Sequence, residues 1–199
     1  MPETSDKYRS KFQSSSTFQQ HGTVEEWKEK VAEVCLQNPV WVTSVLTAFA
    51  APLLSLLGMQ SESGGFHFFG HSSTGKTIAL RLASGVYGQP LVPWRITANA
   101  LEAQAQLHND RVMVLDEVGQ ANPRDVMEAA YMLANSQGKG RLTKDIELRQ
   151  TKTWTLLFLS SGEVSIDELA RKAKTDVFEG QRLRFLSTPM IENQLPTHE

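Results

Sequence analysis

Residues 70–77 of the chain follow the pattern G-x-x-x-x-G-K-[ST], which is typical of a loop that binds phosphate groups. Phosphate oxygens are anionic, so they need several hydrogen-bond donors that converge on one point. A short loop of small residues supplies these donors, because its successive backbone N–H groups turn inward and form a nest. We expect eight residues to bind the phosphates of ATP: Gly70, His71, Ser72, Ser73, Thr74, Gly75, Lys76 and Thr77.

Two side chains of this loop have chemical roles of their own. Lys76 can reach the β- and γ-phosphates as a catalytic cation, and the Thr77 hydroxyl can coordinate Mg²⁺. An apolar run precedes the loop and residues 78–83 have a helical pattern, so the order is strand, loop and helix. The positive end of that helix would point at the same phosphates. An ordinary Gly/Ser turn between strand and helix is the alternative interpretation.

A second signature lies further along the chain, where an apolar run ends in two carboxylates. Residues 111–117 read Arg-Val-Met-Val-Leu-Asp-Glu, which favours a central parallel strand buried on both faces. Ligands bind at the C-terminal edge of such sheets. We expect Asp116 to hold Mg²⁺, directly or through water, and Glu117 to polarise the attacking water as a general base. On its own, such a run often marks only a strand that leaves the core.

Two serines follow the next apolar run. Residues 153–159 are predicted as a second buried strand, and Ser160 and Ser161 come directly after it, beside the acidic edge. One hydroxyl can orient the water or sense the γ-phosphate. The alternative interpretation of each serine is that it belongs to a serine-rich turn that caps the following helix.

Two arginines near the C-terminus are further candidates. Residues 181–186 alternate in the manner of a last strand, which places Arg182 and Arg184 on one face. Either arginine can serve as a finger donated to the γ-phosphate of a neighbouring subunit. Two solvated arginines on a surface strand are the alternative.

The clearest basic cluster lies between residues 139 and 152, which contain five basic and two acidic residues. Residues 137–149 are predicted as a hairpin or exposed loop. Its functional interpretation is contact with a nucleic-acid phosphate backbone, and its alternative is a solvated charged hairpin. The candidate contact residues are Lys139, Arg141, Lys144 and Arg149.

The composition is that of an ordinary globular protein, with 40% hydrophobic and 21% charged residues among 199. The net charge of −2 excludes a global basic field, so any DNA contact has to come from a local patch. Cys35 is the single cysteine, which excludes an intrachain disulfide and fits a reducing cytoplasm. Residues 39–57 are uncharged and nearly long enough to span a bilayer, but prolines and hydroxyl residues favour a buried helix and no membrane contact.

The order of elements predicts an α/β fold, a three-layer P-loop NTPase with a mostly parallel central sheet of the AAA+ or RecA type. Residues 1–22 are expected to be a flexible tail. A T-x-x-E capping box at residue 23 opens a helical pair over residues 23–60, which we interpret as a lid or collar. The P-loop ATPase core is expected over residues 61–190, and a C-terminal tail over residues 191–199.

Several longer stretches are more specific than the phosphate loop. They are Gly64–Phe68, Ser72–Thr77, Leu115–Glu117, Ala129–Asn135, Gln137–Lys139 and Leu157–Glu163. Together they resemble the domain-of-unknown-function 927 family over roughly residues 23–189. The resemblance implies a helicase-like module of bacteria, phages and integrated elements, of a kind often carried with a primase region.

Two functions from different classes fit these observations. The first is an ATP-hydrolysing, helicase-like motor that uses Mg²⁺, binds single-stranded or forked DNA, assembles with itself as a ring and works with a primase in replication of a mobile or phage-type element. The second is a non-motor ATP switch or scaffold that assembles with a replication partner. A small P-loop kinase fits less well, because no Arg-rich lid is found and the Asp116-Glu117 pair suits water activation.

Overall fold

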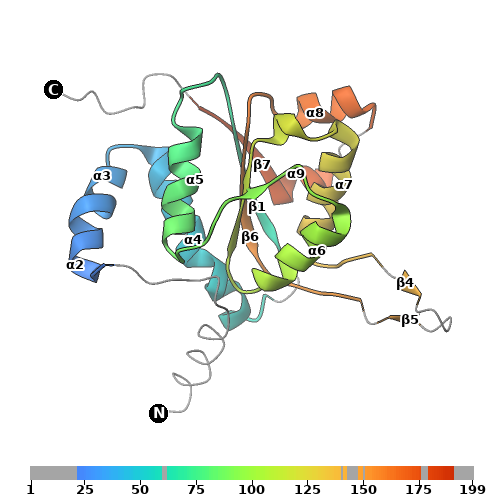
Figure 1. The fold of residues 1–199 in the computed structure, drawn as a ribbon, viewed down its shortest axis with the longest axis horizontal. Coiled ribbons are helices and arrows are strands. Elements are labelled where there is room, and N and C mark those ends of the chain that lie inside the picture. Colours follow the sequence, from blue (N-terminus) through green and yellow to red (C-terminus); the bar gives the residue numbers. More distant parts are fainter. Residues whose placement is uncertain are drawn as a thin grey trace, which may run out of the picture.

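A five-stranded parallel sheet forms the centre of the fold (Figure 1). The structure is a computed structural model and describes residues 22–59, 62–139, 141–142, 148–149, 151–175 and 179–190. The strands are β1 (Gly64–Phe69), β2 (Val92–Pro93), β3 (Val112–Asp116), β6 (Leu157–Gly162) and β7 (Phe185–Pro189). Their order is β2-β3-β6-β1-β7, and every neighbouring pair is parallel. One strand, β6, separates the phosphate-loop strand β1 from the acidic strand β3.

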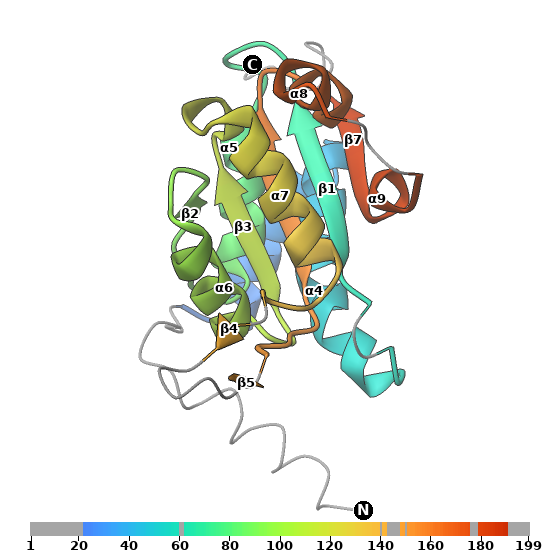
Figure 2. The same ribbon diagram turned by 90° about the vertical axis from the view of Figure 1, so that its right-hand side faces the viewer.

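Helices cover both faces of this sheet, as a parallel sheet requires (Figures 1 and 2). On one face lie α4 (Pro39–Leu56) and α5 (Lys76–Gly85), with α2 (Val24–Trp27), η1 (Lys28–Ala32) and α3 (Glu33–Cys35) outside them. On the other face lie α6 (Ala98–Leu107), α7 (Pro123–Ala134), α8 (Ile166–Ala173) and α9 (Glu179–Arg184). The result is the three-layer α/β architecture that the sequence predicts.

The strand residues alternate between two hydrophobic cores. In β3, Met113 and Leu115 pack towards α6 and α7, whereas Val112 and Val114 pack towards α4 and α5, and all four are fully buried. The same alternation divides β6, where Phe158 belongs to the first core and Leu159 to the second. It also decides which face each polar residue at the strand ends occupies.

The N-terminal helices begin where the sequence predicts them. The Thr23 hydroxyl accepts a hydrogen bond from the Glu26 N–H, and the Glu26 carboxylate accepts one from the Thr23 N–H, so the capping box is confirmed. Asn38 caps α4, and Pro39 occupies its first turn.

Helix α4 forms part of the hydrophobic core. By length and composition it is the one described helix that is able to cross a membrane. However, its Val45, Ala48 and Ala51 are buried in the core that α4 shares with α5, and α4 packs against β3 and β6. The division of the chain into a helical pair and a core at residue 61 stays a prediction.

The predicted strand over residues 181–186 is wrong at its start, because residues 179–184 form helix α9 and β7 begins at Phe185. The Phe185 ring packs against the rings of Phe158 and His67, whereas Leu183 is 72% exposed. Burial of Phe185 beside β1, rather than the local alternation, therefore sets where the strand begins.

The strand predicted over residues 153–159 also begins later, at Leu157. The residues before it pair with the segment after α7 instead: the Trp154 N–H donates to the Ser136 carbonyl, and Gln137 bridges Thr153. This pairing forms the base of a hairpin whose short strands β4 (Arg141–Leu142) and β5 (Leu148–Arg149) are antiparallel. The predicted hairpin is confirmed for the described residues.

Candidate nucleotide site

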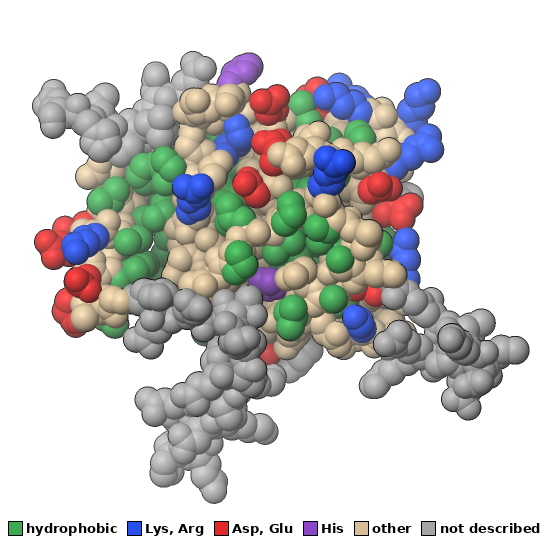
Figure 3. Space-filling view, viewed as in Figure 1, with side chains coloured by type: hydrophobic (Ala, Val, Ile, Leu, Met, Phe, Trp, Pro, Cys, Tyr) green, Lys and Arg blue, Asp and Glu red, His purple; other side chains and the backbone are tan. Residues whose placement is uncertain are grey.

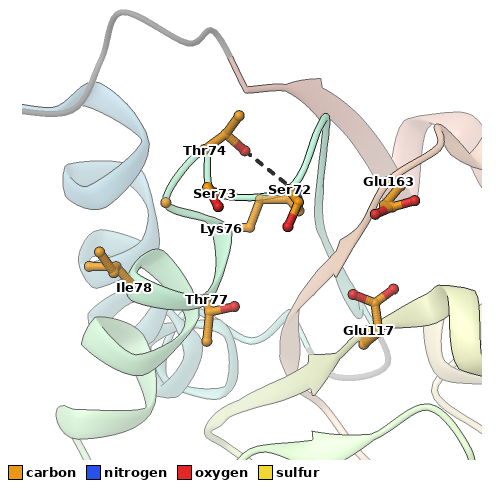
Figure 4. A pocket seen from close by; sticks show the side chains of 9 residues that line it. Ser72, Ser73, Thr74, Lys76, Thr77, Ile78, Glu117 and Glu163 are labelled. Atoms are coloured by element: carbon orange, nitrogen blue, oxygen red, sulfur yellow. Dashed lines mark hydrogen bonds between the residues drawn. The ribbon is translucent and has the colours of Figure 1, made fainter.

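An open cleft of about 270 Å³ lies at the C-terminal edge of the sheet (Figure 4). The loop between β1 and α5 forms one side, and the turns that follow β3 and β6 form the other. The lining residues are Ser72, Ser73, Thr74, Gly75, Lys76, Thr77, Ile78, Glu117 and Glu163. The structure therefore brings the phosphate loop and Glu117, which directly follows β3, into one cleft.

The phosphate loop has the backbone conformation that an anion nest needs. Gly75 has a φ of +88° and directly precedes α5, a left-handed conformation that favours glycine. No side chain caps the start of α5, so its first backbone N–H groups stay available to an anion at the positive end of the helix. Ser73 also has a positive φ, and the Thr74 hydroxyl donates to the His71 carbonyl at 2.9 Å. The His71 side chain is exposed.

Lys76 is held by the loop itself. Its side chain is 8% exposed, and the ammonium donates to the carbonyls of Gly70 at 2.7 Å and His71 at 2.6 Å. The Thr74 hydroxyl oxygen lies 3.5 Å away as a third acceptor. An ammonium has three donors, so this arrangement satisfies the buried charge while Lys76 still lines the cleft.

The carboxylate of Asp116 is fixed by Ser161 on the neighbouring strand. The Ser161 hydroxyl donates to Asp116 Oδ1 at 2.8 Å and accepts a hydrogen bond from the Glu117 N–H at 3.1 Å. Asp116 is half-buried and is not among the residues that line the cleft, but Glu117 directly after it is. Ser161 thus ties the ends of β3 and β6 together and fixes one of the two Asp116 oxygens.

The available ligands suit Mg²⁺ bound together with phosphate. Within the described part of the chain, no group of three or more His, Cys, Asp and Glu side chains gathers to hold a metal alone. Thr77 lines the cleft and Asp116 lies beside Glu117, and both offer oxygen ligands. Mg²⁺ prefers oxygen, keeps several waters and is commonly held by one or two protein groups plus substrate phosphates, so these residues fit it.

Glu117 enters the cleft because the backbone turns sharply after β3. Its φ is +53°, which is uncommon for a residue with a side chain and is found preferentially at functional sites. Glu117 Oε1 accepts a hydrogen bond from the Gly119 N–H at 3.1 Å, which orients the carboxylate. Figure 4 shows this carboxylate pointing into the cleft.

Ser160 lies on the opposite face of β6 from Ser161 and does not line the cleft. It is fully buried: its hydroxyl oxygen accepts from Trp94 Nε1–H at 2.8 Å and lies 3.0 Å from His67 Nδ1. Burial lowers the pKa of His67 to about 4, with a smaller lowering from the charge of Lys76, so the ring is neutral near pH 7. Of the two serine hydroxyls, it is that of Ser161 that donates to Asp116.

Glu163 lines the cleft, although the sequence interpretation did not select it. It follows Gly162, the last residue of β6, so it occupies the same sheet edge as Glu117. Its signal in the sequence is the one that marks Glu117, namely a carboxylate just after a buried apolar run.

Both candidate finger arginines have partners within their own chain. Arg182 forms an exposed ion pair with Asp167 at 3.0 Å. Arg184 donates to Asn135 Oδ1 at 3.2 Å and lies 3.7 Å from the Glu62 carboxylate. Because Arg184 directly precedes β7, it lies at the N-terminal edge of the sheet, opposite to its own cleft.

The basic hairpin is also remote from the cleft. It leaves the fold near the start of β6, at the other end of the sheet (Figure 1). The Lys139 ammonium pairs with Glu128 at 2.9 Å, and the Lys139 N–H donates to Glu102. Arg141 and Arg149 are directly opposite each other on β4 and β5, and Lys144 lies outside the described residues. On the face in Figure 3, basic and acidic side chains of the described residues are interspersed.

The fold of this chain is similar to that of a solved helicase structure. The helicase described as "SCCmec type IV Cch - active helicase" has a TM-score of 0.65 and 23% identity over 92% of this chain and 34% of that chain. The JCV helicase has a TM-score of 0.46 and 14% identity, over 85% of this chain and 45% of its own. NtrX from Brucella abortus in complex with ATP has a TM-score of 0.43 and 14% identity, over 95% of this chain and 40% of the NtrX chain. No curated protein sequence matches the chain.

At 23% identity, the similarity to the SCCmec helicase concerns the fold alone, and the chain spans about a third of the length of that helicase. A match between the sequence and a family model is more direct evidence of family membership. The family model described as "Domain of unknown function (DUF927)" matches residues 4–153, which is more than half of the chain. The chain therefore belongs to the DUF927 family, and its α/β fold is similar to that of the SCCmec helicase.

Proposed function

We propose that the chain is a P-loop ATPase and acts as a helicase-like module on DNA in replication of a mobile or phage-type element. One observation supports this most strongly: Lys76 and Thr77 face Glu117 across a single cleft, and Asp116 is tied directly beside Glu117 by Ser161. A phosphate cradle alone would suit a binding protein. A carboxylate opposite that cradle adds the means to activate water.

The residues of the cleft have distinct tasks in this hydrolysis. The backbone N–H groups of the loop bind the phosphates of ATP, and Lys76 exchanges its loop carbonyls for phosphate oxygens. Thr77 and Asp116 would hold Mg²⁺, which neutralises charge on the phosphate oxygens when bound. Glu117 accepts a proton from the attacking water, and Ser161 keeps Asp116 oriented.

The DNA and assembly parts of the proposal have separate support. The fold is similar to that of helicases, and the chain carries a projecting hairpin with basic residues far from the cleft. We propose that Lys139, Arg141, Lys144 and Arg149 contact single-stranded or forked DNA. The exposed ion pair of Lys139 is weak enough to exchange for a phosphate.

Assembly as a ring would bring an arginine of one copy to the cleft of another. Arg182 and Arg184 are the proposed donors, and each would first leave its partner in its own chain. A separate primase is the proposed replication partner, and the cytoplasm the proposed location.

A non-motor ATP switch is the second candidate. It is favoured by the net charge of −2 and by the interspersed basic and acidic side chains of the described residues on the face in Figure 3. Such a switch would use the same cleft, hydrolyse ATP slowly and assemble on a replication partner.

The decisive experiment measures the ATPase rate of the purified protein with and without single-stranded DNA, alongside the mass of the assembly by light scattering. The motor predicts a higher rate with DNA. Glu117→Gln should retain ATP binding and lose about 10²- to 10⁴-fold in kcat, whereas Lys76→Ala should lose binding. If the protein assembles as a ring and its ATPase rate is the same with and without single-stranded DNA, the result would favour the switch. A wild type that neither binds nor hydrolyses ATP would refute the proposal.

A further inference from the structure

We propose that Glu163 is a second catalytic carboxylate of the cleft, which accepts a hydrogen bond from the attacking water opposite Glu117, and that Trp94 positions it through a buried chain of hydrogen bonds. This inference rests on the proposed ATPase function, and it adds a residue and a positioning device to that site.

Glu163 lines the part of the cleft in which the proposed attacking water would lie. Strand β6 is between β1 and β3, so the turn after β6 comes between the phosphate loop and Glu117. Figure 4 shows the carboxylates of Glu163 and Glu117 pointing towards one another on the side of the cleft that faces Lys76 and Thr77. Among the described residues, none donates a hydrogen bond to Glu163 or forms an ion pair with it. Its oxygens are therefore available to a water molecule.

The start of this turn is tightly packed. A Cβ atom on Gly162 would lie 2.3 Å from Val118 Cγ1 and 3.1 Å from His67 Cε1. The backbone before Glu163 is thus wedged between the turn after β3 and the ring of His67. This leaves little freedom for the position at which the Glu163 side chain begins.

A buried chain of hydrogen bonds fixes the other side of the turn. Trp94 Nε1–H donates to Ser160 Oγ at 2.8 Å, Ser160 is 3.0 Å from His67 Nδ1, and His67 Nε2 is 2.8 Å from the Val164 carbonyl. A carbonyl only accepts, so Nε2 carries the hydrogen of the neutral ring. Nδ1 is then an acceptor, and the Ser160 hydroxyl must donate to it. Each group has one possible role, so the chain has one direction.

This chain connects the acidic strand to the turn that carries Glu163. The Trp94 backbone N–H donates to the Asp116 carbonyl at 3.2 Å, which anchors the chain to β3. Val164, at the other end, directly follows Glu163. The ring of Trp94 and the side chains of Ser160 and His67 are all buried, so water does not compete for these bonds.

The two carboxylates divide the work on one water molecule. As the water oxygen forms its bond to the γ-phosphorus, the bond from that phosphorus to the bridging oxygen of ADP breaks. Glu117 takes one proton of the water and passes it to the released phosphate. Glu163 holds the second proton by a hydrogen bond and does not remove it. With both protons engaged, the water lone pair is directed at the phosphorus.

The test of Glu163 compares kcat, KM and ATP binding for the wild type, Glu163→Gln and Glu163→Ala. Glutamine keeps an acceptor oxygen, so we expect its kcat within about threefold of the wild type. Alanine removes the acceptor, so we expect kcat to fall about 10- to 100-fold while ATP affinity stays within twofold. A Glu163→Ala kcat within twofold of the wild type overturns the proposal. Equal losses in both variants also overturn it, because Glu163 would then act through its charge.

The same measurements separate this inference from the proposed function. A wild type without hydrolysis contradicts the ATPase itself, whereas a fully active Glu117→Gln contradicts the role of Glu117 as general base. An active wild type, an inactive Glu117→Gln and an active Glu163→Ala contradict only the role of Glu163.

The test of Trp94 uses Trp94→Phe, which removes the Nε1–H together with part of the buried ring, so it needs a control that loses the same atoms. Trp41→Phe is the matched control, because Trp41 is equally buried, lies in α4 on the other face of the sheet, and has no partner for its Nε1–H among the described residues. We expect Trp94→Phe to lower kcat about three- to tenfold with KM unchanged, and Trp41→Phe to leave kcat unchanged.

A double-mutant cycle decides whether Trp94 acts through Glu163. If it does, Trp94→Phe has no further effect on kcat once Glu163→Ala is present. An equal loss with and without Glu163 overturns the positioning role. If Trp94→Phe fails to fold, Ser160→Ala interrupts the same chain by loss of a single oxygen, and the same cycle applies.

Discussion

The buried ring of His67 predicts a specific sensitivity of the fold to acid. Burial lowers its native pKa to about 4, against about 6.5 for an exposed histidine. As the pH falls, the unfolded chain therefore binds a proton before the native chain does. The free energy of unfolding is highest above pH 6.5, decreases as the pH falls, and stops changing through this group below about pH 4.

The size of this effect follows from the two pKa values. One pKa unit corresponds to about 1.4 kcal/mol, so the full contribution of His67 is about 3 kcal/mol. Between pH 7 and pH 4.5, roughly 2 kcal/mol of that is lost. Stability of a domain is about 5–15 kcal/mol in total, so the loss is large enough to measure.

The assay is urea unfolding at several pH values between 7 and 4.5, for the wild type and for His67→Gln. Glutamine can still donate to the Val164 carbonyl, but it does not titrate. Carboxylates and His108, whose pKa is also lowered by burial, contribute to both curves and cancel in the difference. We expect the wild type to lose about 2 kcal/mol more than the variant. Equal pH dependence in the two proteins would refute the assignment of a neutral buried ring.

Two further predictions concern single atoms near the sheet. A Cβ on Gly65 would lie 1.8 Å from the Phe158 carbonyl oxygen, so Gly65→Ala should abolish soluble expression. Gly85 is a helical residue with open space around its Cβ position, so the control Gly85→Ala should raise the melting temperature slightly. Ser161→Ala should raise the Mg²⁺ concentration needed for half-maximal ATPase activity, because Asp116 loses its fixed orientation, and Ser161→Thr should restore it; an unchanged Mg²⁺ dependence would contradict this role.

The general fold was predictable because its signals are local. The glycines of the phosphate loop and the apolar run before Asp116 identify two strands and the edge where they end. Parallel pairing then places the C-terminal ends of both strands at the same edge of the sheet, and the structure shows Lys76 and Glu117 lining one cleft there. Similarly, the capping box at Thr23 marks a helix start without any tertiary contact.

Other features depend on contacts between distant residues, and the sequence alone did not determine them. Ser160 and Ser161 are chemically identical, and only the register of β6 against its neighbours shows which one faces Asp116. The alternation around Arg184 fits a strand as well as a short helix, and packing of Phe185 decides between them. Glu163 follows an apolar run just as Glu117 does, but its proximity to Glu117 depends on the order of the strands in the sheet.

The Lys76 ammonium joins the carbonyls of Gly70 and His71, and these two hydrogen bonds hold the phosphate loop in one compact shape. A ligand that enters such a preorganised loop does not have to order its backbone, so little conformational entropy is lost on association. Nucleotide capture should then be fast, and differences in affinity between nucleotides should appear mainly in how quickly each one leaves.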